Sequence, residues 1–588
     1  MHALPRASWA AITAAALTAG LLSAPAAATP AGPCDTPPDR EIAEVQGSGA
    51  ATPLAGQTVR VEGVVTADFQ RTDQLSGFFL QDPTPDADPA TSDALFAFAR
   101  ESFKDVKVGD RVLVTGRAIE FNGWTELSPV TAVDVCGTGS IAPQRHRLPS
   151  ADLEPVENML LTFPQRLTVN DNYNLGRFGE VTLSSGGRLF QPTDRPGVTA
   201  DDNARRSLLV DDGSNQQNPA TLPPVVRAGD SATGITGVLG YGFDRYRLQP
   251  TEPIRYQSTN PRLPRPFPMI GNVTVASFNT LNWFTTIGSR GASTAEEQQR
   301  QLAKLVSALK GLNADAVGLM EVENNGQTAL QALVDAVNAE MGAGTYAALT
   351  HPYPGTDAIQ VGLIYKPGKL TPVGQARSSE DPVFSRPPLV QSFRRKHGGQ
   401  PFTMVVNHLK SKGSCPDSGP DADQGDGQGC WNPTRVAQAQ ALLGLIEDLP
   451  APLVLGDLNA YGEEDPIEAL EAGGLTSLTK RYVPAPLRYS YLFDGLAGEL
   501  DHMMASKQLL RRVTSAAIWH VNADEPRIRD YNTEFNPPHL YRPDAYRSSD
   551  HDPGRRPHPA RPLTRARPRA RPLAGPRARG PARSMECW

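Results

Sequence analysis

The sequence predicts an α+β protein with a β-rich N-terminal half and a C-terminal half in which strands alternate with helices. Residues 40–135 and 150–255 contain short apolar runs broken by Gly, Pro and Asp, a pattern typical of strands and turns. From residue 272 onward, segments such as VTVASF and DAVGLMEVE alternate with segments of helical periodicity. Such alternation indicates helices layered on sheets. A chain of 588 residues is too long for one core, so we expect several domains.

The N-terminus has the organisation of a secretory signal. Met1–Arg6 carries one arginine, residues 7–23 are small and apolar, and Ala26–Ala28 provides an A-x-A cleavage site. A membrane anchor is the alternative, but the apolar run is short and a cleavage motif follows it. We therefore predict a signal peptide over residues 1–28, a secreted protein, and no transmembrane segment in the mature chain.

Export permits disulfides, and the chain has five cysteines. We expect the pairs Cys34–Cys136 and Cys415–Cys430, which leaves Cys587 over, although sequence alone does not fix connectivity. No Cys/His spacing typical of structural zinc is present.

The net charge of −6 is unevenly distributed, because residues 553–588 contain ten arginines and one glutamate. The rest of the chain is therefore more acidic still. Such a body would bind a polyanion through metal ions and local groups rather than through its global field.

The strand pattern of residues 29–150 resembles an oligonucleotide-binding (OB) barrel, with VGDRVLVTGRAIEFNGWTEL near its end. The resemblance implies contact with nucleic acid through aromatic side chains that stack on bases. A β-domain without a ligand is the alternative, because a small barrel needs most of its aromatic side chains as core. The candidate stacking residues are Phe69, Phe78, Phe79, Phe121 and Trp124.

Three further segments follow the first β-domain. Residues 151–256 are predicted to form a second β-rich domain, in which ATGITGVLGYGFDRYRLQP echoes the first and suggests a degenerate repeat. Residues 257–269 are Pro-rich and indicate a linker. Residues 270–552 form the alternating domain, where Thr294 and Glu297 fit a capping box and Asn432-Pro433 opens another helix.

Polar residues stand at the ends of several apolar strands in this last domain. Loops that rise from a rigid sheet commonly carry functional groups, and six strands that each deliver one are hard to explain as surface decoration. The candidates are Asn279, Glu321, Glu323, Asn407, His408, Asp457, Asn459, Asp501, Asp550 and His551.

These residue types suit the transfer of a phosphoryl group to water. Carboxylate and amide oxygens are ligands for Mg²⁺ or Mn²⁺, with Ca²⁺ as a further candidate. A histidine acts as a general acid or base, and a neighbouring aspartate fixes its tautomer. The absence of a G-x-x-x-x-G-K-[ST] loop argues against P-loop triphosphate hydrolysis, and the absence of a G-x-S-x-G elbow argues against an esterase.

The motif series SFNTLNW, GLMEVENNG, VVNHLKSKGS, LVLGDLNAYGEEDP, YSYLFDGLAGELDHMMAS and SSDHDP resembles the endonuclease/exonuclease/phosphatase superfamily, which includes type I deoxyribonuclease. With the preceding OB-like segment, the order is similar to secreted bacterial nucleases of the ExeM/NucH type. The resemblance implies a four-layer α/β/β/α sandwich over residues 270–552, with the site at one end of its sheets.

The resemblance also implies a role for each matching residue. Glu321 is the principal metal ligand with Asn279 beside it, and Asp550 touches a metal or shapes its shell. Asp457 activates water and Asn459 holds phosphoryl oxygens. His551 contacts the phosphate or carries a proton while Asp501 holds it, and His408 lies near the scissile phosphate. The residues assigned to substrate binding are Asn459, His408 and Tyr365. Whether one or two metals act stays open.

Several residues have a simpler structural explanation. Glu323 is expected to be a bystander, and His502 to face away from Asp501 on its strand. His351 and Tyr365 either line a substrate groove or belong to the core. The loop between Cys415 and Cys430 holds four aspartates but lacks the EF-hand pattern, so we expect a solvated loop rather than a Ca²⁺ site.

The chain departs from the family pattern after Asp552. The segment PGRRPHPARPLTRARPRARPLAGPRARGPARSMECW has almost no apolar periodicity, so residues 553–588 are predicted to be a disordered tail that cannot form a core strand. Its bias suggests a frameshift in the gene; a basic arm for nucleic acid is the alternative.

The expected function is hydrolysis of phosphodiester bonds in extracellular DNA, or RNA, by a monomeric secreted enzyme that uses Mg²⁺ or Mn²⁺. One alternative is a phospholipid or small-molecule phosphodiesterase, because the same constellation serves those substrates. Another is a non-catalytic nucleic-acid-binding protein whose hydrolase domain is crippled by the altered C-terminus.

Overall fold

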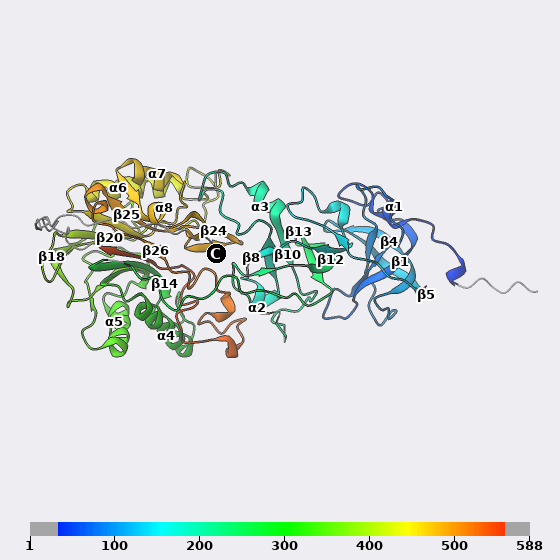
Figure 1. The fold of residues 1–588 in the computed structure, drawn as a ribbon, viewed down its shortest axis with the longest axis horizontal. Coiled ribbons are helices and arrows are strands. Elements are labelled where there is room, and N and C mark those ends of the chain that lie inside the picture. Colours follow the sequence, from blue (N-terminus) through cyan, green and yellow to red (C-terminus); the bar gives the residue numbers. More distant parts are fainter. Residues whose placement is uncertain (1–32, 220, 223, 270, 559–588) are drawn as a thin grey trace, which may run out of the picture.

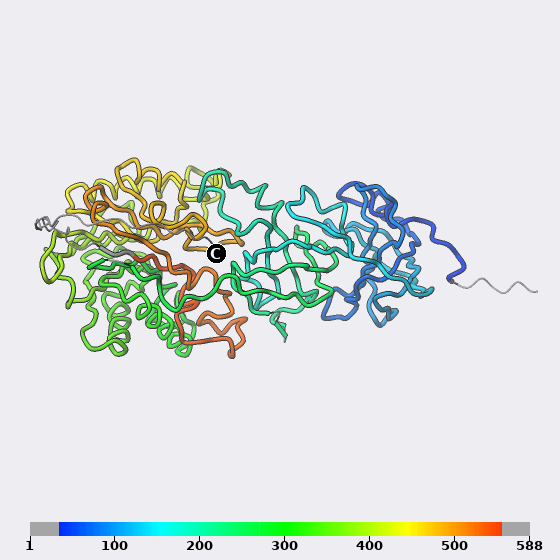
Figure 2. The backbone as a smooth tube through the Cα atoms, viewed as in Figure 1, coloured from blue at the N-terminus to red at the C-terminus, as the bar shows by residue number. Residues whose placement is uncertain are grey.

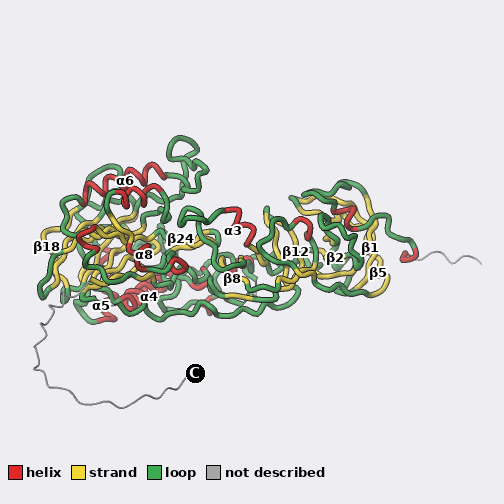
Figure 3. The backbone as a smooth tube through the Cα atoms, turned by 45° about the horizontal axis from the view of Figure 1, so that its top comes forward, coloured by secondary structure: helices red, strands yellow, loops and turns green. Residues whose placement is uncertain are grey.

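Three β-rich bodies follow one another along an elongated molecule (Figures 1 and 2). The computed structural model describes residues 33–219, 221–222, 224–269 and 271–558. A barrel lies at one end, an eight-stranded sheet in the middle, and two six-stranded sheets at the other end. The helices of greatest length accompany the last two sheets (Figure 3). The predicted signal peptide lies outside the described residues, and no helix within them is apolar and long enough for a bilayer.

The first body is a closed five-stranded barrel in the order β1-β2-β3-β5-β4, with a short helix, α1, beside it. Its strand β3 runs parallel to β5, and β1 closes the barrel against β4. The turn between β4 and β5 contains Asn122 and Gly123, both with positive φ, as a two-residue hairpin requires. The elements are α1 (Ile42–Gln46), β1 (Thr58–Phe69), β2 (Gly77–Gln81), β3 (Ala94–Ala97), β4 (Asp110–Phe121) and β5 (Trp124–Thr138).

The aromatic residues of the barrel do not form the predicted stacking surface. Phe78 belongs to the barrel core. Phe69, Phe79 and Trp124 pack together between the barrel and the next sheet, with the ring centroids of Phe79 and Trp124 6.0 Å apart. Only Phe121 of the five candidates is exposed, at 55%. The prediction is therefore wrong for the buried members, because Phe78 fills the barrel core and the neighbouring sheet covers the face with Phe69, Phe79 and Trp124.

The middle body is an eight-stranded sheet in the order β11-β8-β9-β10-β13-β12-β7-β6. It is not a second barrel, so the prediction of a degenerate repeat is wrong. The two segments look alike in sequence only because each contains a hairpin of alternating apolar residues, β4–β5 in the barrel and β12–β13 in the sheet. Its elements are β6 (Gln144–Arg145), β7 (Leu160–Phe163), β8 (Leu167–Asp171), α2 (Leu175–Phe178), β9 (Val181–Ser184), α3 (Ala200–Arg206), β10 (Ser207–Val210), β11 (Ser231–Ala232), β12 (Ile235–Gly242) and β13 (Arg245–Pro250).

The last body has two six-stranded sheets. The first has the order β16-β17-β15-β14-β27-β26, with β14 (Val273–Trp283), β15 (Ala316–Glu323), β16 (Ala347–Ala348), β17 (Ile359–Tyr365), β26 (Ala517–Ile518) and β27 (Gly554–His558). The second has the order β18-β19-β20-β21-β25-β22, with β18 (Leu370–Arg377), β19 (Leu389–Arg395), β20 (Phe402–His408), β21 (Pro452–Asp457), β22 (Leu475–Ser477) and β25 (Asp501–Ser506). A separate hairpin pairs β23 (Tyr491–Phe493) with β24 (Leu496–Gly498).

The two sheets share one apolar core, in which Met320 and Leu363 of the first meet Met404 and Leu455 of the second. They approach so closely that a Cβ on Gly318 would lie 2.5 Å from a methyl of Leu455. Helices cover the outer face of each sheet, α4 and α5 on the first and α6 and α7 on the second (Figure 1). The helices are α4 (Ala295–Leu312), α5 (Thr328–Met341), α6 (Asn432–Ile446), α7 (Asp465–Ala472), α8 (Leu478–Tyr482) and α9 (Lys507–Leu510).

The predicted helix starts are confirmed. Thr294 is the N-cap of α4, and its hydroxyl accepts a hydrogen bond from the Glu297 amide at 3.2 Å. Helix α6 begins at Asn432 with Pro433 in its first turn. Both signals depend on backbone groups that a helix leaves without partners at its N-terminus, so they hold in any tertiary context.

The chain beyond Asp552 contributes a strand that its composition did not suggest. Gly554–His558, β27, pairs with β14 from Ser277 to Val273 and with β26 on its other side. The prediction that this segment cannot form a core strand is wrong for these five residues, because a ladder needs backbone groups rather than particular side chains. Residues 559–588, and with them Cys587, lie outside the described part.

Both predicted disulfides are present, Cys34–Cys136 and Cys415–Cys430. The first joins the start of the described chain to the end of β5, and the second closes the loop before α6.

Polar contacts fix the middle sheet to the last body. The carboxylate of Asp524 is fully buried and accepts from Arg188 at 2.9 Å, with Arg227 at 3.4 Å. The segment predicted to be a linker takes part, since Arg262 forms two hydrogen bonds to Glu525, of 2.8 and 2.6 Å. Charge-assisted contacts of this kind hold the two bodies in one arrangement.

A buried carboxyl group lies where the barrel meets the middle sheet. Glu157 Oε2 accepts from the Thr125 amide at 3.3 Å, and the neighbouring Asn158 accepts from the Trp124 indole at 2.7 Å. The other oxygen of Glu157 is buried without a hydrogen-bond partner among the described residues. Burial, together with the nearby charge of Glu154, raises the pKa of Glu157 to about 9.

We predict that Glu157→Gln stabilises the protein at alkaline pH. A carboxyl whose folded pKa of about 9 exceeds the ordinary 4.5 costs stability progressively as pH rises between these values. The variant should therefore gain about 1–3 kcal/mol at pH 8 and nothing near pH 4, measured as the melting temperature by calorimetry. The exposed Glu101→Gln serves as the control, and an equal effect of Glu157→Gln at both pH values would contradict the prediction.

Candidate functional site

Three polar side chains lie side by side because of the register of three adjacent strands. His408, the last residue of β20, pairs with Asp457, the last of β21, and Asp457 pairs with Asp501, the first of β25. The preceding Gly456 has φ +135, and a Cβ there would lie 2.0 Å from the Asn407 carbonyl oxygen. Only glycine fits at this point, so the GDLN motif positions Asp457 through its backbone as well as its side chain.

Glu321 reaches this group through an irregularity in β15. The pairing of β15 with β17 shifts between Leu319 and Val322, and Glu321 has φ +60. Strict alternation would turn Glu321 away from the inner face that Met320 occupies. A bulge re-aims a side chain, and a left-handed non-glycine residue costs on the order of 1–2 kcal/mol. The backbone strain therefore lies at Glu321, the residue predicted to be the principal metal ligand.

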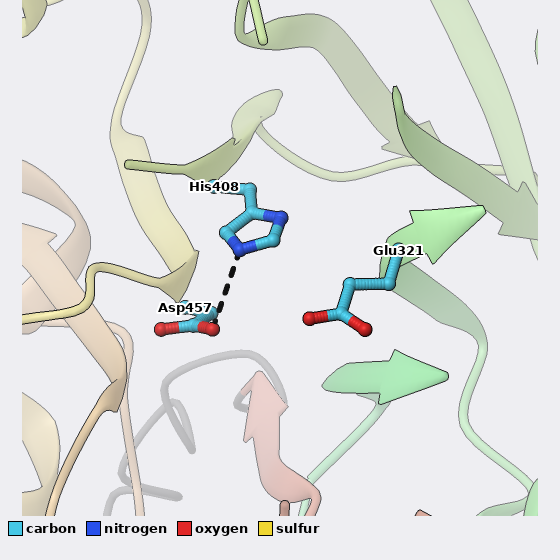
Figure 4. A group of neighbouring side chains, drawn as sticks. All are labelled: Glu321, His408 and Asp457. Carbon is cyan, nitrogen blue, oxygen red and sulfur yellow. Dashed lines mark ion pairs between the residues drawn. The ribbon is translucent and has the colours of Figure 1, made fainter. Parts of the chain in front are cut away.

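Glu321, His408 and Asp457 each present one ligand atom, and these atoms lie within 4.8 Å of one another (Figure 4). His408 Nε2 is 3.5 Å from Asp457 Oδ2. The Asn279 amide lies between the two acids and donates to Glu321 Oε1 at 3.1 Å and to Asp457 Oδ2 at 3.3 Å. The structure therefore brings together four of the predicted residues from both sheets.

His551 and Asp501 form a second polar pair beside this cluster. His551 Nδ1 lies 2.7 Å from Asp501 Oδ2, and its Nε2 lies 3.9 Å from Asp457 Oδ2. The Ser490 hydroxyl accepts a hydrogen bond from the Asp501 amide. The ring centroids of Tyr491 and His551 lie 4.6 Å apart. With Nδ1 committed to Asp501, Nε2 is the nitrogen that faces the cluster.

The loop that carries Asp550 and His551 is held from behind by a buried network. Asp552 Oδ1 accepts from three consecutive amides, those of residues 521–523. The Asn522 side chain donates to the His551 carbonyl at 2.6 Å and accepts from the Ser548 amide at 2.9 Å. The second aspartate of SSDHDP is therefore a positioning residue, a function that sequence reasoning missed.

The electrostatics of the cluster favour a positive partner. Burial raises the pKa of Glu321, and the nearby Asp550 raises it further. Burial likewise raises the pKa of Asp457 to about 7, opposed by His551 and reinforced by Asp501. Two acids with raised pKa values in one place are the expected signature of a site built for a cation or a proton.

The two histidines differ in charge. Burial lowers the pKa of His408 well below the ordinary range, and the adjacent Arg386 guanidinium, with Nη1 at 3.3 Å from His408 Nε2, adds to this. Burial alone would also lower the pKa of His551, but the carboxylates of Asp501, Asp457 and Asp550 outweigh it and raise the pKa well above its usual value. The site therefore holds one neutral imidazole and one imidazolium.

Two of the remaining candidates, Asn459 and Asp550, lie at the edge of the cluster. Asn459 has φ +47, donates to the Leu409 carbonyl at 3.2 Å, and through its amide caps Asp457 Oδ1 at 2.9 Å. Asp550 accepts from the Ser549 hydroxyl at 3.3 Å and lies close enough to Glu321 to influence its pKa. These two border the cluster.

Tyr365 does not join the site. It pairs with Ala316 at the opposite end of β15 from Glu321, and its ring packs on Phe393. We therefore correct its assignment to substrate binding. Its strand runs antiparallel to β15, so the end of the strand points away from the site.

The other bystanders have structural partners. Glu323 accepts from the Thr285 amide at 2.7 Å, His502 contacts the Ala460 carbonyl at 2.8 Å, and His351 contacts the Pro387 carbonyl at 3.1 Å.

Arg386, Ser490 and Tyr491 contact the site and were not predicted. None of them stands at the end of a long apolar strand, so periodicity offered no signal. The run YSYLFDG, which contains Ser490 and Tyr491, was read only as part of the motif series.

Residues 277–551 match the sequence model of the Endonuclease/Exonuclease/phosphatase family, so the chain contains a domain of this family. Such proteins are generally phosphoesterase hydrolases and typically depend on divalent metals. Residues 150–260 match a second model, described as a domain of unknown function (DUF8508). No curated protein sequence matches the chain significantly.

Solved structures with some likeness include a family protein from Bacteroides thetaiotaomicron (16% identity, 48% of this chain and 96% of that one, TM-score 0.34). Another is D. rerio TDP2 in complex with a single-strand DNA product (15%, 48% and 97%, TM-score 0.33). A third is a mannosyl-6-phosphatase, also from B. thetaiotaomicron (16%, 49% and 99%, TM-score 0.34). At TM-scores below 0.5 these likenesses do not define the substrate of this chain.

We predict that Asp501→Asn lowers the pKa of His551, because Asp501 contributes more than the other carboxylates to raising it. The measurement is an NMR titration of labelled histidines in metal-free protein. Glu499→Gln, a buried acid two residues away, is the matched control and should leave His551 unchanged. An unchanged His551 titration in Asp501→Asn would show that the pair in the structure does not form in solution.

Proposed function

From the presence of a domain of this hydrolase family, we propose that the chain is a secreted, metal-dependent nuclease that hydrolyses phosphodiester bonds in extracellular DNA, with RNA as a second substrate. The observation that supports it most is the convergence of Glu321, His408 and Asp457 within 4.8 Å, beside the His551–Asp501 pair. Carboxylates, an amide and an imidazole in one cluster are the groups that metal-assisted phosphoryl transfer uses.

The donor set fits a hard divalent cation such as Mg²⁺ or Mn²⁺. Glu321 and Asp457 offer carboxylate oxygens, and Asp550 lies near enough to Glu321 to complete one side. The Asn279 side chain donates its N–H groups to both acids and its oxygen accepts from the Leu281 amide, so its amide would rotate to offer an oxygen to the ion. When bound, the ion would polarise a phosphoryl oxygen and lower the pKa of water. We assign Glu321 and Asn279 as its holders, with Asp550 at its edge.

The chain's own residues supply the proton chemistry. Asp457, with its pKa raised to about 7, is able to take a proton from an attacking water near neutral pH. Its orientation is fixed because Oδ1 accepts the Asn459 amide, which leaves Oδ2 toward the cluster. Asn459 and His408 border the space that the phosphate would occupy.

His551 would act on the negative charge of the phosphate or of the leaving oxygen. Held through Nδ1 by Asp501, it presents a protonated Nε2, which would pair with a phosphate oxygen or donate its proton to the leaving oxygen. Asp501 orients the ring through its contact with Nδ1 and stabilises the positive charge of His551. Burial keeps the His408 ring neutral by lowering its pKa, and Arg386, with Nη1 3.3 Å from His408 Nε2, adds to this.

We propose further that the last body is a four-layer sandwich of the type I deoxyribonuclease kind and that the barrel is an OB barrel. The strand order β1-β2-β3-β5-β4, closed by β1 and β4, supports the latter. Together with the motif series, these features support a relationship to nucleases of the ExeM/NucH type. Cleavage at residue 28 and export remain part of this proposal.

We predict that the protein degrades plasmid DNA only with Mg²⁺ or Mn²⁺ and that EDTA abolishes the reaction. Asp457→Asn and His551→Ala should each lower the rate by about 10²–10⁴-fold, because each removes a proton-transfer group. Tyr365→Phe, at the far end of the sheet, is the matched control and should retain full activity.

The same preparations distinguish the rival functions. Turnover of sphingomyelin or sugar phosphates without DNA cleavage would replace the nuclease by a small-molecule phosphoesterase. DNA binding without any hydrolysis would leave a non-catalytic binder. Equal activity of Asp457→Asn and wild type would reject the assigned site.

We predict that Glu321→Gln weakens the affinity for Mn²⁺ by at least about tenfold, because it removes one anionic donor. Free Mn²⁺ is measured by electron paramagnetic resonance during a titration. Glu323→Gln, on the same strand but bonded to Thr285, should bind Mn²⁺ as wild type does. Loss of affinity in both variants would mean that the strand, not the ligand, had been disturbed.

A further inference from the structure

A cavity of about 480 Å³ lies next to the catalytic cluster, between the middle sheet and the last body. Asp550 and Tyr491 line it, and Tyr491 packs on the ring of His551, so the cavity begins one residue from the proposed proton carrier. Its volume is typical of sites for small ligands. The wall opposite is formed by residues 171–174, which comprise the last residue of strand β8 of the middle body and the three residues after it.

The two walls are fixed relative to one another. The Ala497 amide donates to the Leu189 carbonyl at 3.0 Å, and the Gln191 amide donates to the Ala497 carbonyl at 2.9 Å. The Asn172 side chain donates to the Asp524 carbonyl at 3.0 Å. These hydrogen bonds hold the middle body and the last body in one arrangement, so the cavity between them is a fixed feature of the structure.

Two aromatic side chains at this cavity are exposed to solvent, Tyr173 at 56% and Phe493 at 62%. Tyr173 is nevertheless held in place, since Arg527 donates to its hydroxyl at 2.8 Å and lies over its ring at 5.3 Å. Exposed aromatic faces of this kind provide stacking surfaces for bases, with little entropy left to lose on binding.

The charges of the cavity also suit a phosphodiester chain. Arg527 and Arg547 contribute guanidinium groups, and Arg547 Nε has no hydrogen-bond partner among the described residues. Of the four acids that line the cavity, Glu525 is paired with Arg262 and Asp494 has Arg245 at 3.9 Å. The other two are Asp171, which accepts from the Tyr173 amide, and Asp550, which accepts from the Ser549 hydroxyl beside the catalytic cluster. Arginine beside aromatic rings is the combination used by proteins that bind single-stranded nucleic acid.

Resting on the nuclease function proposed above, we infer that the middle body and the last body jointly form a subsite for one unpaired nucleotide that flanks the scissile phosphate. The base stacks on Tyr173 and Phe493, and Arg527 contacts its phosphate. A base in a duplex has both faces covered by its neighbours, so this subsite favours single strands or positions where a base is unpaired. Residues 150–260 thereby contribute to substrate choice.

The test compares kcat/KM for a single-stranded oligonucleotide, its duplex, and bis(p-nitrophenyl) phosphate, which is too short to extend into the cavity. For Tyr173→Ala/Phe493→Ala, the ratio of single-strand to bis(p-nitrophenyl) phosphate kcat/KM should fall by about tenfold or more, and the single-strand preference should shrink. Phe243→Ala, an 87% exposed aromatic in the β12–β13 hairpin of the middle body, should preserve both ratios.

A second variant tests the phosphate contact. Arg527→Gln should weaken binding of the single strand and lower the slope of log K against log salt by about 0.7, the value for one lost phosphate contact. Melting temperatures equal to wild type would exclude unfolding as the cause.

The outcomes separate this inference from the function on which it rests. If wild type cleaves nucleic acid but the double variant keeps both ratios, the subsite is wrong and the nuclease stands. A fall of equal size on all three substrates also overturns the subsite. If wild type cleaves no nucleic acid, the proposed function fails and the subsite with it.

Discussion

The arrangement of the last body depends on one constraint, the concentration of acidic groups at a point where two sheets meet. Glu321 from one sheet and Asp457 from the other share the Asn279 amide, and both have raised pKa values because burial disfavours their charge. Such a pair is stable only while surrounding structure holds it. The glycine before Asp457 and the bulge at Glu321 show how much local geometry serves this purpose.

Much of this site was predictable because its residues end apolar strands. His408, Asp457 and Asn279 were identified in this way, and strand register accounts for their convergence. The assignment of Tyr365 to substrate binding, which was not based on this rule, failed, since the direction of a strand within a sheet cannot be read from its apolar pattern. Arg386 and Tyr491 escaped prediction because they come from a loop and a short hairpin. Glu321 was identified by the same rule, but the bulge that turns its side chain toward the site could not be predicted, because strict alternation places it on the other face.

At the scale of domains, element types were easier to predict than their partnerships. The helix caps could be expected from local chemistry. Both disulfide pairings were expected and are present, although sequence alone does not fix connectivity. The burial of Phe69 and Phe79 could not, because it depends on which surface the middle sheet covers. The prolines of residues 257–269 likewise indicated a spacer, yet Arg262 within this segment forms an ion pair with Glu525 of the last body. The middle sheet therefore links the barrel to the hydrolase-like body and also contributes one side of the cavity beside His551.

The pairing of β27 between β14 and β26 has a consequence for how the chain folds. Strand β14 pairs with β15 on one edge, but its other edge is covered only by β27, so the first sheet is complete only after segments far apart in the sequence have met. Until then β14 has one open edge, and the body cannot close around its core. A sheet completed only by segments so far apart in the sequence is expected to form slowly, because the chain between them must be ordered before their pairing stabilises the fold.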